Sequence, residues 1–323
     1  MEGARLVCLR PDDLTWDRAV RLFELRSRSQ NFSPTTQTHY KVHLGYWRDW
    51  LGVNGGLQPP QVTTEVLRGY LASMKARGCK DAYVDSAFRI LKCFWRFLER
   101  EGLLLVNPMT RVERPRREKR MVRPFSEEQV RLLLAAIDTH DPLGVRDYAL
   151  ILMLCDTGLR ISEALAVKIS DIDLGQRTIT VTNAKGRKER LVAFGRSTLR
   201  AIMNWLKTRG DIPGVEILWV NRFGGPLTRR TAEDILKEHG TRAGIQGVRI
   251  SPHTLRHTFA TCFLRNGGDI FALQKLLGHA NLEMVRHYAQ VSDTDTQAKH
   301  RLASPIDRLG PLPNERKQVR LRS

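Results

Sequence analysis

The sequence has few cysteines and no long apolar run, and each shortage argues against a class of protein. The five cysteines form an odd set without a CxxC pair: Cys8, Cys79, Cys93, Cys155 and Cys262. This pattern argues against a disulfide framework and a zinc site. The longest apolar stretch, YALILMLC at 148–155, is too short to span a bilayer. The N-terminus also lacks an apolar signal core. We therefore expect a soluble, cytoplasmic protein without a membrane partner.

Basic residues are in large excess. Lys and Arg total 53 and Asp and Glu total 34, which gives a formal net charge of +19. Such an excess favours a polyanionic partner, because each neutralised phosphate releases counterions. A basic protein that is merely soluble is the alternative. The surplus is shared by both halves of the chain, and this favours a protein that grips DNA from two sides.

Composition and periodicity divide the chain into four segments. Residues 12–107 show apolar positions at three- and four-residue spacing, which predicts a bundle of about four helices. Residues 108–124 contain three prolines and no apolar period, so we interpret them as a basic linker. Residues 125–305 form a second domain, and residues 306–323 form a basic C-terminal tail.

The linker is a candidate DNA contact. Its basic side chains could follow a phosphate backbone, and a solvated connector that happens to be charged is the alternative reading. The residues concerned are Arg116, Arg117, Lys119 and Arg120.

The second domain begins as helix and then changes period. Ser126, followed by Glu127, Glu128 and Gln129, predicts a capped helix start. Residues 177–183 and 189–194 alternate apolar and polar residues around the turn AKGRK, which predicts a β-hairpin. Further helical patterns occupy 127–137, 146–155, 196–208, 228–243, 252–265, 269–277 and 281–290.

Five short motifs in this domain carry the chemistry: TGLRISEAL (157–165), NAKGRKER (183–190), HTLRH (253–257), LLGHANLEMV (276–285) and RHYAQ (286–290). Taken singly, none is decisive. An HxxR pair on one helical face could be a surface ion-pair site, and a tyrosine after a helix is usually packing. The information lies in the order and spacing of all five.

That order resembles the tyrosine recombinase family, the phage-integrase and Xer-like group. The family carries Arg in a TGLR segment, Lys in a hairpin turn, then HxLRH, LGH, and a Tyr nine residues after that His. The matching residues here are Arg160, Lys185, His253, Arg256, His279 and Tyr288. The turn reads AKGRK where a glycine often precedes the lysine.

The resemblance implies a mainly α fold with a small antiparallel β-sheet. It would consist of a SAM-like N-terminal helical bundle for core DNA binding and a mixed α/β catalytic domain, together forming a C-shaped clamp on DNA. The implied activity is site-specific recombination, in which strands are cleaved and rejoined through a 3′-phosphotyrosine link. The implied assembly is a dimer on one double-stranded site and a homotetramer on paired sites, with no cofactor and no metal.

The residue types suit this chemistry. A phenol such as Tyr288 can act as nucleophile, and Arg160 and Arg256 can present donor forks to phosphate oxygens. His253 lies three residues before Arg256, so both fall on one helical face, and its imidazole can accept the phenol proton or donate to the phosphate. The resemblance makes Lys185 the general acid for the leaving 5′ oxygen and gives His279 a hydrogen bond to the phosphate.

Neighbouring residues have weaker claims. Arg187 and Lys188 lie beside Lys185 and could be confused with it, and we also expect them to contact DNA. Glu163 lies one helical turn after Arg160 and could orient a histidine, hold the arginine or form an ordinary ion pair. Aromatic residues of the first domain recur at core-like spacing and are interpreted as packing rather than base stacking: Trp47, Trp50, Tyr83 and Trp95.

Two other functions compete with recombination. A type IB topoisomerase shares similar chemistry but relaxes supercoils without pairing sites, and the separate helical N-domain favours recombination over it. A DNA-binding accessory protein would be expected to have lost members of the catalytic set, and here all are present.

Overall fold

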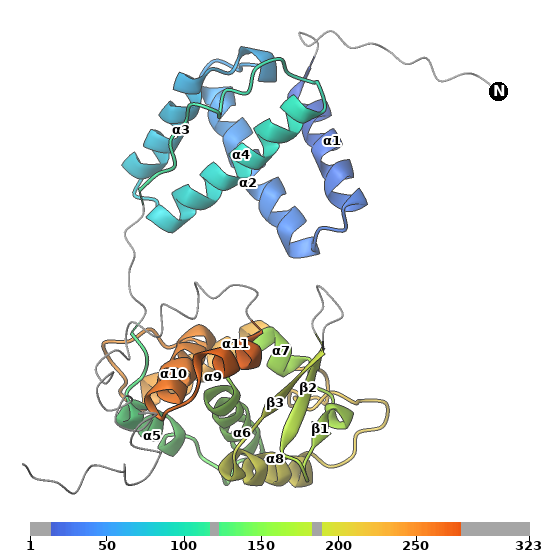
Figure 1. Cartoon of the computed structure of the whole chain (residues 1–323), viewed down its shortest axis with the longest axis vertical. Coiled ribbons are helices and arrows are strands. Elements are labelled where there is room, and N and C mark those ends of the chain that lie inside the picture. Colours follow the sequence, from blue (N-terminus) through green and yellow to red (C-terminus); the bar gives the residue numbers. More distant parts are fainter. Residues whose placement is uncertain (1–13, 117–122, 183–188, 279–323) are drawn as a thin grey trace, which may run out of the picture. The chain divides into compact units, whose positions relative to one another are not determined.

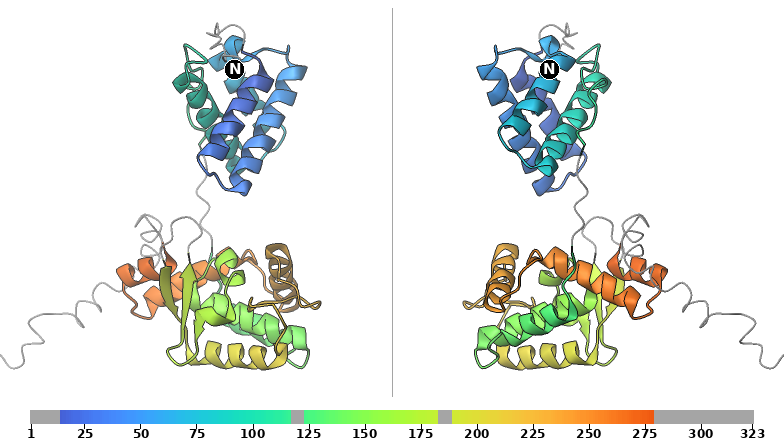
Figure 2. Two further views of the ribbon diagram at one scale, coloured as in Figure 1. Left: turned by 90° about the vertical axis from the view of Figure 1, so that its right-hand side faces the viewer. Right: turned by 90° about the vertical axis from the view of Figure 1, so that its left-hand side faces the viewer.

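The computed structural model describes residues 14–116, 123–182 and 189–278. Its internal contacts divide the chain into two units, Met1–Arg120 and Met121–Ser323. Figures 1 and 2 show the first as a helical bundle and the second as helices with a small sheet. The predicted fold class, mainly helical with a small antiparallel sheet, is confirmed.

The N-terminal unit packs around one central helix. Its elements are α1 (Trp16–Ser29), α2 (Pro34–Val53), a short 3₁₀ helix (Pro59–Gln61), α3 (Thr64–Ala76) and α4 (Asp81–Arg100). Helix α4 buries residues on more than half of its circumference, because apolar side chains recur at three- and four-residue spacing. The three other long helices all pack against it. Gly78 and Gly102 follow the ends of α3 and α4 with positive φ, which is the conformation that favours glycine after a helix.

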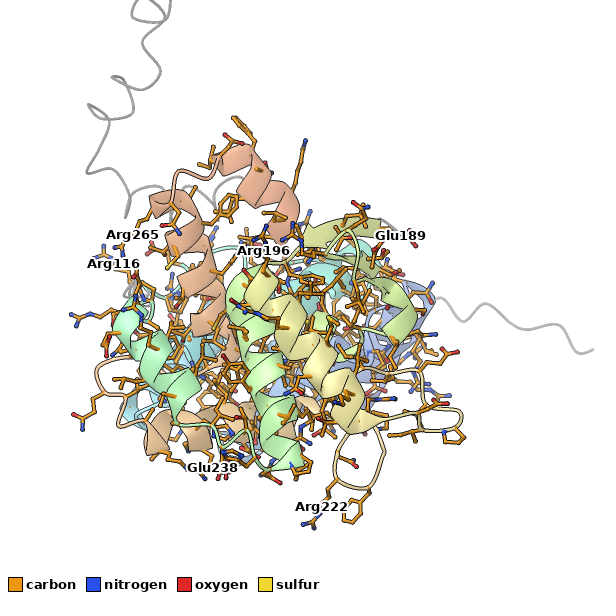
Figure 3. The ribbon with its side chains drawn as sticks, turned by 90° about the horizontal axis from the view of Figure 1, so that it is seen from below. Arg116, Glu189, Arg196, Arg222, Glu238 and Arg265 are labelled. Atoms are coloured by element: carbon orange, nitrogen blue, oxygen red, sulfur yellow. The ribbon has the colours of Figure 1, made fainter. Side chains whose placement is uncertain are left out.

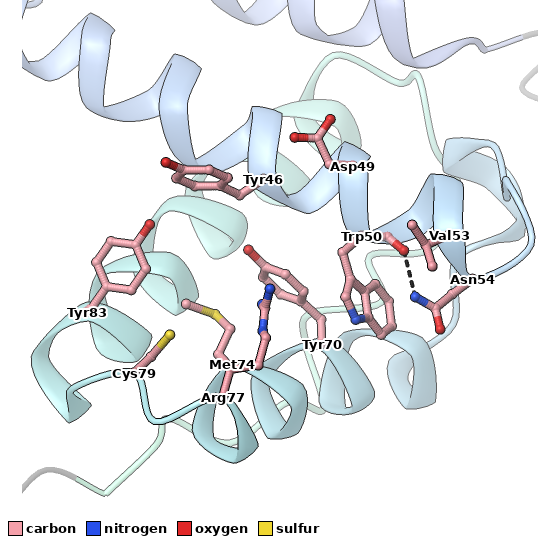
Figure 4. A pocket seen from close by; sticks show the side chains of 10 residues that line it. All are labelled: Tyr46, Asp49, Trp50, Val53, Asn54, Tyr70, Met74, Arg77, Cys79 and Tyr83. Atoms are coloured by element: carbon pink, nitrogen blue, oxygen red, sulfur yellow. Dashed lines mark hydrogen bonds between the residues drawn. The ribbon is translucent and has the colours of Figure 1, made fainter.

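Aromatic rings fill this core, though less completely than the sequence predicts. Trp47 and Trp95 are fully buried, and Trp16 lies against both with ring centroids 6.1 and 5.8 Å apart. Trp50 is half-buried. Tyr83 is 37% exposed, and its ring packs against His43 with centroids 4.8 Å apart. Tyr83 also lines a cavity of about 580 Å³ between α2 and α3, together with Tyr46 and Met74 (Figure 4).

The first residues of the linker are tied to this bundle. Arg114 donates from Nε and Nη2 to the buried Asp85 carboxylate of α4, at 2.6 and 3.0 Å. Arg68 and Thr64 of α3 donate to the backbone carbonyls of Arg111 and Pro108. The chain therefore follows the N-terminal unit as far as Arg114.

The second unit begins with helices and then forms a sheet. Its elements are α5 (Glu127–Ala135), α6 (Pro142–Thr157), α7 (Ile161–Leu165), a 3₁₀ turn (Ile169–Asp171), β1 (Ile172–Asp173), β2 (Thr178–Thr182), β3 (Glu189–Ala193), α8 (Arg196–Arg209), α9 (Arg229–Arg242), α10 (Pro252–Arg265) and α11 (Ile270–Leu277). Ser126 and Gln129 form the predicted reciprocal cap of α5. The expected hairpin is present, with Thr180 opposite Leu191, and β1 adds a third antiparallel strand.

Helix α6 is the centre of this unit. It packs against α8 and α10. Figure 3 shows α6 and α8 running side by side. Its buried residues include Ala149, Leu150 and Met153, and they join the inward-facing Ile179 and Val192 of the sheet in one core. Because α6 is held on several sides, its C-terminal end at Thr157 is a fixed point for the loop that follows.

The described residues lack two kinds of feature, one concerning membranes and one concerning metals. Among them, no helix is long and apolar enough to cross a membrane. The same part of the chain holds no group of three or more His, Cys, Asp or Glu side chains arranged to bind a metal ion.

Candidate active site

A left-handed glycine places the first arginine of the site. Gly158 ends α6 with φ +61°, and a Cβ there would lie 2.2 Å from Cδ1 of Phe259 and 3.0 Å from Cδ2 of Leu277. Only glycine fits both the backbone conformation and the space. The chain can therefore turn sharply from α6, bury Leu159, and bring Arg160 to the start of α7 with its side chain 37% exposed.

Glu163 holds Arg160 by two hydrogen bonds. The backbone N–H of Arg160 donates to Oε2 at 3.0 Å, and its Nη1 donates to Oε1 at 2.7 Å. This pairing is common to two of the roles considered for Glu163, holding the arginine and forming an ordinary ion pair. The same carboxylate accepts from a second arginine, Arg190 of β3, at 2.7 and 3.3 Å. Burial alone would raise the pKa of Glu163, but hydrogen bonds from Arg190 and Arg160 outweigh it and lower the pKa.

Arg256 joins three segments from inside the unit. Its side chain on α10 is buried, and Nη1 donates to the carbonyl of Gly158 at 2.6 Å. Nη2 donates to the carbonyl of Leu277 at 2.7 Å. Helix α10 therefore fixes both the loop that carries Arg160 and the end of α11.

His253 lies one turn before Arg256 on the same helix and remains exposed to solvent. Partial burial lowers its pKa, and the positive charges of Arg229, Arg256 and Arg249 lower it further. Glu233 acts in the opposite direction. The imidazole is therefore neutral at physiological pH, which is the form that can accept a proton.

A cavity of about 910 Å³ lies beside Arg160, and neither His253 nor Arg256 of α10 is among its lining residues. Arg160 and Glu163 line it from α7, Thr180 and Thr182 line it from β2, and Gly278 lines it from the end of α11. Thr182 is the last described residue before the hairpin turn, and Gly278 is the last before His279. The cavity thus lies where the chain enters the segments that carry the other motif residues.

Several predicted site residues lie outside the described part of the chain: Lys185, His279, Tyr288, Arg117, Lys119, Arg120, Arg187 and Lys188. Arg116, the remaining linker candidate, is described and is exposed. Of the six predicted catalytic residues, the structure describes Arg160, His253 and Arg256, and it brings the two arginines to the same loop.

Arg190 was missed by the sequence reasoning. Its Nε donates to the carbonyl of Leu276 at 3.0 Å, and its Nη atoms hold Glu163, so it connects β3 with α7 and α11. One signal could have identified it. Arg190 stands two residues before Val192, and side chains at that spacing share a strand face, so it is a charged residue on the inward face of the hairpin.

Comparisons with known proteins agree with this arrangement. The family model described as the phage integrase family matches residues 123–295, more than half of the chain. Tyrosine recombinase XerC of Haemophilus influenzae (strain PittEE) is 35% identical over 264 residues, covering 81% of this chain and 88% of that protein. Tyrosine recombinase XerC of Bacillus subtilis (strain 168) is 34% identical over 281 residues, covering 84% and 91%.

Solved structures show the same fold. The XerA recombinase crystal structure is 26% identical with a TM-score of 0.51, and the match covers 89% of this chain and 98% of that one. The Tn1549 transposon integrase, solved with a circular intermediate DNA, is 20% identical with a TM-score of 0.74, covering 91% and 99%. The motifs, the family model and the curated relatives agree, and the chain therefore belongs to the phage integrase family, the tyrosine-type site-specific DNA recombinases.

Proposed function

We propose that the chain cleaves and rejoins double-stranded DNA through a covalent 3′-phosphotyrosine link at Tyr288. The phenolic oxygen attacks the scissile phosphorus, an Oη–P bond forms, and the bond from phosphorus to the 5′ oxygen breaks. His253 accepts the phenol proton and Lys185 protonates the departing 5′ oxygen. The reverse sequence of steps, with a 5′ hydroxyl from the partner strand, rejoins the DNA.

Charge on the phosphate is stabilised by guanidinium groups in this proposal. Arg160 is partly exposed and lines a cavity, and Arg256 is anchored to the carbonyls of Gly158 and Leu277. A guanidinium presents a planar fork of donors that suits phosphate oxygens. His279 would add a hydrogen bond to the phosphate. The observation that carries the proposal is that Arg160 lines a cavity and that its loop is held by Arg256 of α10 through the Gly158 carbonyl.

The proposed partner is duplex DNA, bound by two units in a clamp. The net charge of +19 supports a polyanionic partner. The Tn1549 integrase, a structural neighbour, was solved with DNA. The linker residues Arg116, Arg117, Lys119 and Arg120 and the turn residues Arg187 and Lys188 would contact phosphates. A dimer would occupy one site and a homotetramer two paired sites on nucleoid DNA in the cytoplasm.

A nicked suicide substrate tests the nucleophile. The wild-type protein is expected to form a protease-sensitive covalent adduct, because loss of a short 5′ fragment prevents rejoining. The Tyr288→Phe variant lacks the attacking oxygen, so it should bind the same DNA and form no adduct. Undiminished adduct in Tyr288→Phe would refute the assignment. Rapid relaxation of any supercoiled plasmid without a target site would favour a topoisomerase instead.

A further inference from the structure

Arg190 is the second residue of β3, and its side chain is almost buried, at 12% exposed. Both of its Nη atoms donate to the Glu163 carboxylate, at 2.7 and 3.3 Å, and Nε donates to the Leu276 carbonyl at 3.0 Å. Three different elements therefore meet at one guanidinium: β3, α7 and the end of α11.

The charges of Arg160, Glu163 and Arg190 sum to a net positive charge, and a positive charge favours phosphate binding. Arg160 and Arg190 each contribute one positive charge, and the Glu163 carboxylate between them contributes one negative charge. The group keeps a net positive charge at the cavity that Arg160 and Glu163 line. Without Arg190, the carboxylate would cancel the charge of Arg160. Because Glu163 is only 9% exposed, water would screen that cancellation poorly.

The second contact holds the last turn of α11. Arg190 holds the Leu276 carbonyl while Arg256 holds the next one, that of Leu277. Gly278 follows with φ +62°, and a Cβ there would lie 3.1 Å from Cζ of Arg190. Two arginines therefore hold the last two carbonyls of α11, and Gly278 follows them in the sequence.

We propose that Arg190 is a positioning residue for strand cleavage: it neutralises Glu163, so that the charge of Arg160 remains available to the scissile phosphate, and it fixes the end of α11. The inference rests on the proposed function, in which Arg160 contacts that phosphate. Arg190 itself touches no reacting atom. It acts through Glu163 and through the Leu276 carbonyl.

The test is a double-mutant cycle on the suicide substrate. Arg190→Gln, Glu163→Gln and the double variant are compared by single-turnover cleavage at saturating protein, with DNA affinity measured separately. Arg190→Gln should slow cleavage by about 10- to 100-fold, somewhat less than the loss of a direct transition-state donor, with affinity changed by no more than about threefold. Glu163→Gln in that background should restore about tenfold, because it removes the uncompensated negative charge.

A purely structural role for Arg190 would not give this recovery of cleavage in the double variant, because a second substitution in the core would slow cleavage further. Arg190→Lys keeps the charge but loses the forked geometry and the contact with the Leu276 carbonyl, so it should cleave faster than Arg190→Gln and slower than wild type. Arg242→Gln is the matched control. It removes one positive charge and one exposed ion pair, with Glu238, from the same unit. Figure 3 shows Glu238 far from Glu189, the neighbour of Arg190, and this variant should cleave like wild type.

Three results would overturn the inference. The first is Arg190→Gln cleaving within about threefold of wild type. The second is a double variant as slow as Arg190→Gln, and the third is Arg190→Lys as slow as Arg190→Gln. If Arg190→Gln does not fold, the double variant, which removes one charge of each sign, still tests the inference. Cleavage by the double variant that is more than about 100-fold slower than wild type would count against it. Failure of the proposed function would look different, because covalent adduct would then persist in Tyr288→Phe.

Discussion

His253 is the described residue whose protonation state the proposed reaction uses. It is exposed at the first turn of α10, yet partial burial and then the charges of Arg229, Arg256 and Arg249 lower its pKa below 6.5. A lowered pKa means that protons bind only at more acidic pH, so the neutral base persists through the physiological range. Activity that needs neutral His253 is therefore retained at pH 6.5 and is lost as the pH falls through the lowered pKa.

The pKa of His253 can be measured directly in the free protein by NMR titration of its ring protons. We expect a value below 6.5 in the wild type. Arg229→Gln removes one of the positive charges that disfavour protonation, so it should move the pKa toward 6.5. Arg242→Gln should leave it where it is. A wild-type value above 6.5, or no response to Arg229→Gln, would contradict the assigned cause.

At the scale of single residues, motifs in the sequence predict which residues form the site but not which groups those residues contact. The spacing of His253 and Arg256 predicted one helical face, and both lie on α10. The partners of Arg256 could not be predicted, because they are backbone carbonyls of residues 158 and 277, and carbonyls carry no sequence signal. Arg190 escaped notice for a related reason: its importance comes from where a hairpin strand packs, not from a motif.

Helix α6 and the loop after it show how a secondary-structure element positions a side chain of the candidate site. The buried side chains of α6 fix its axis, and Gly158 turns the chain so that Arg160 starts α7. Helical periods, caps and the hairpin were visible in the sequence because each repeats over several residues or has a marked end. Strand β1 has only two residues, too few to show a period of two, and so it was missed.

Gly158→Ala should therefore damage both stability and cleavage. The substitution forces a side chain into a left-handed conformation and against Phe259, at a cost of roughly 2–4 kcal/mol. Gly244→Ala is the matched control, because its φ is +66° and nothing lies within 4 Å of the added Cβ. It should cost only about 1–2 kcal/mol. Urea unfolding of both variants measures the difference, and equal costs would mean that the crowding around Gly158 does not matter.

Each unit of the chain has its own hydrophobic core. One core is built around α4 in residues 14–112, and the other around α6 in residues 125–255. In the sequence, a change in composition and period along the chain predicts two domains joined by a linker at residues 108–124. How the two units bind DNA depends on the linker and on the DNA itself, and no periodic pattern in the protein sequence predicts it.

Salt dependence of DNA binding tests the role of the linker. Each phosphate contact contributes about 0.9 to the slope of log affinity against log salt concentration. Arg116 is exposed in the described part of the linker, so Arg116→Gln should reduce the slope by about one and weaken binding equally for all sequences. Fluorescence anisotropy over a salt series measures this. An unchanged slope would remove Arg116 from the interface.

The most direct test of the whole account is to locate the covalent bond. The adduct trapped on a nicked suicide substrate is digested with nuclease and protease, and mass spectrometry identifies the peptide that keeps a nucleotide. We predict a 3′-linked nucleotide on Tyr288 and on no other residue. A nucleotide attached elsewhere, or linked through its 5′ end, would contradict the proposed mechanism.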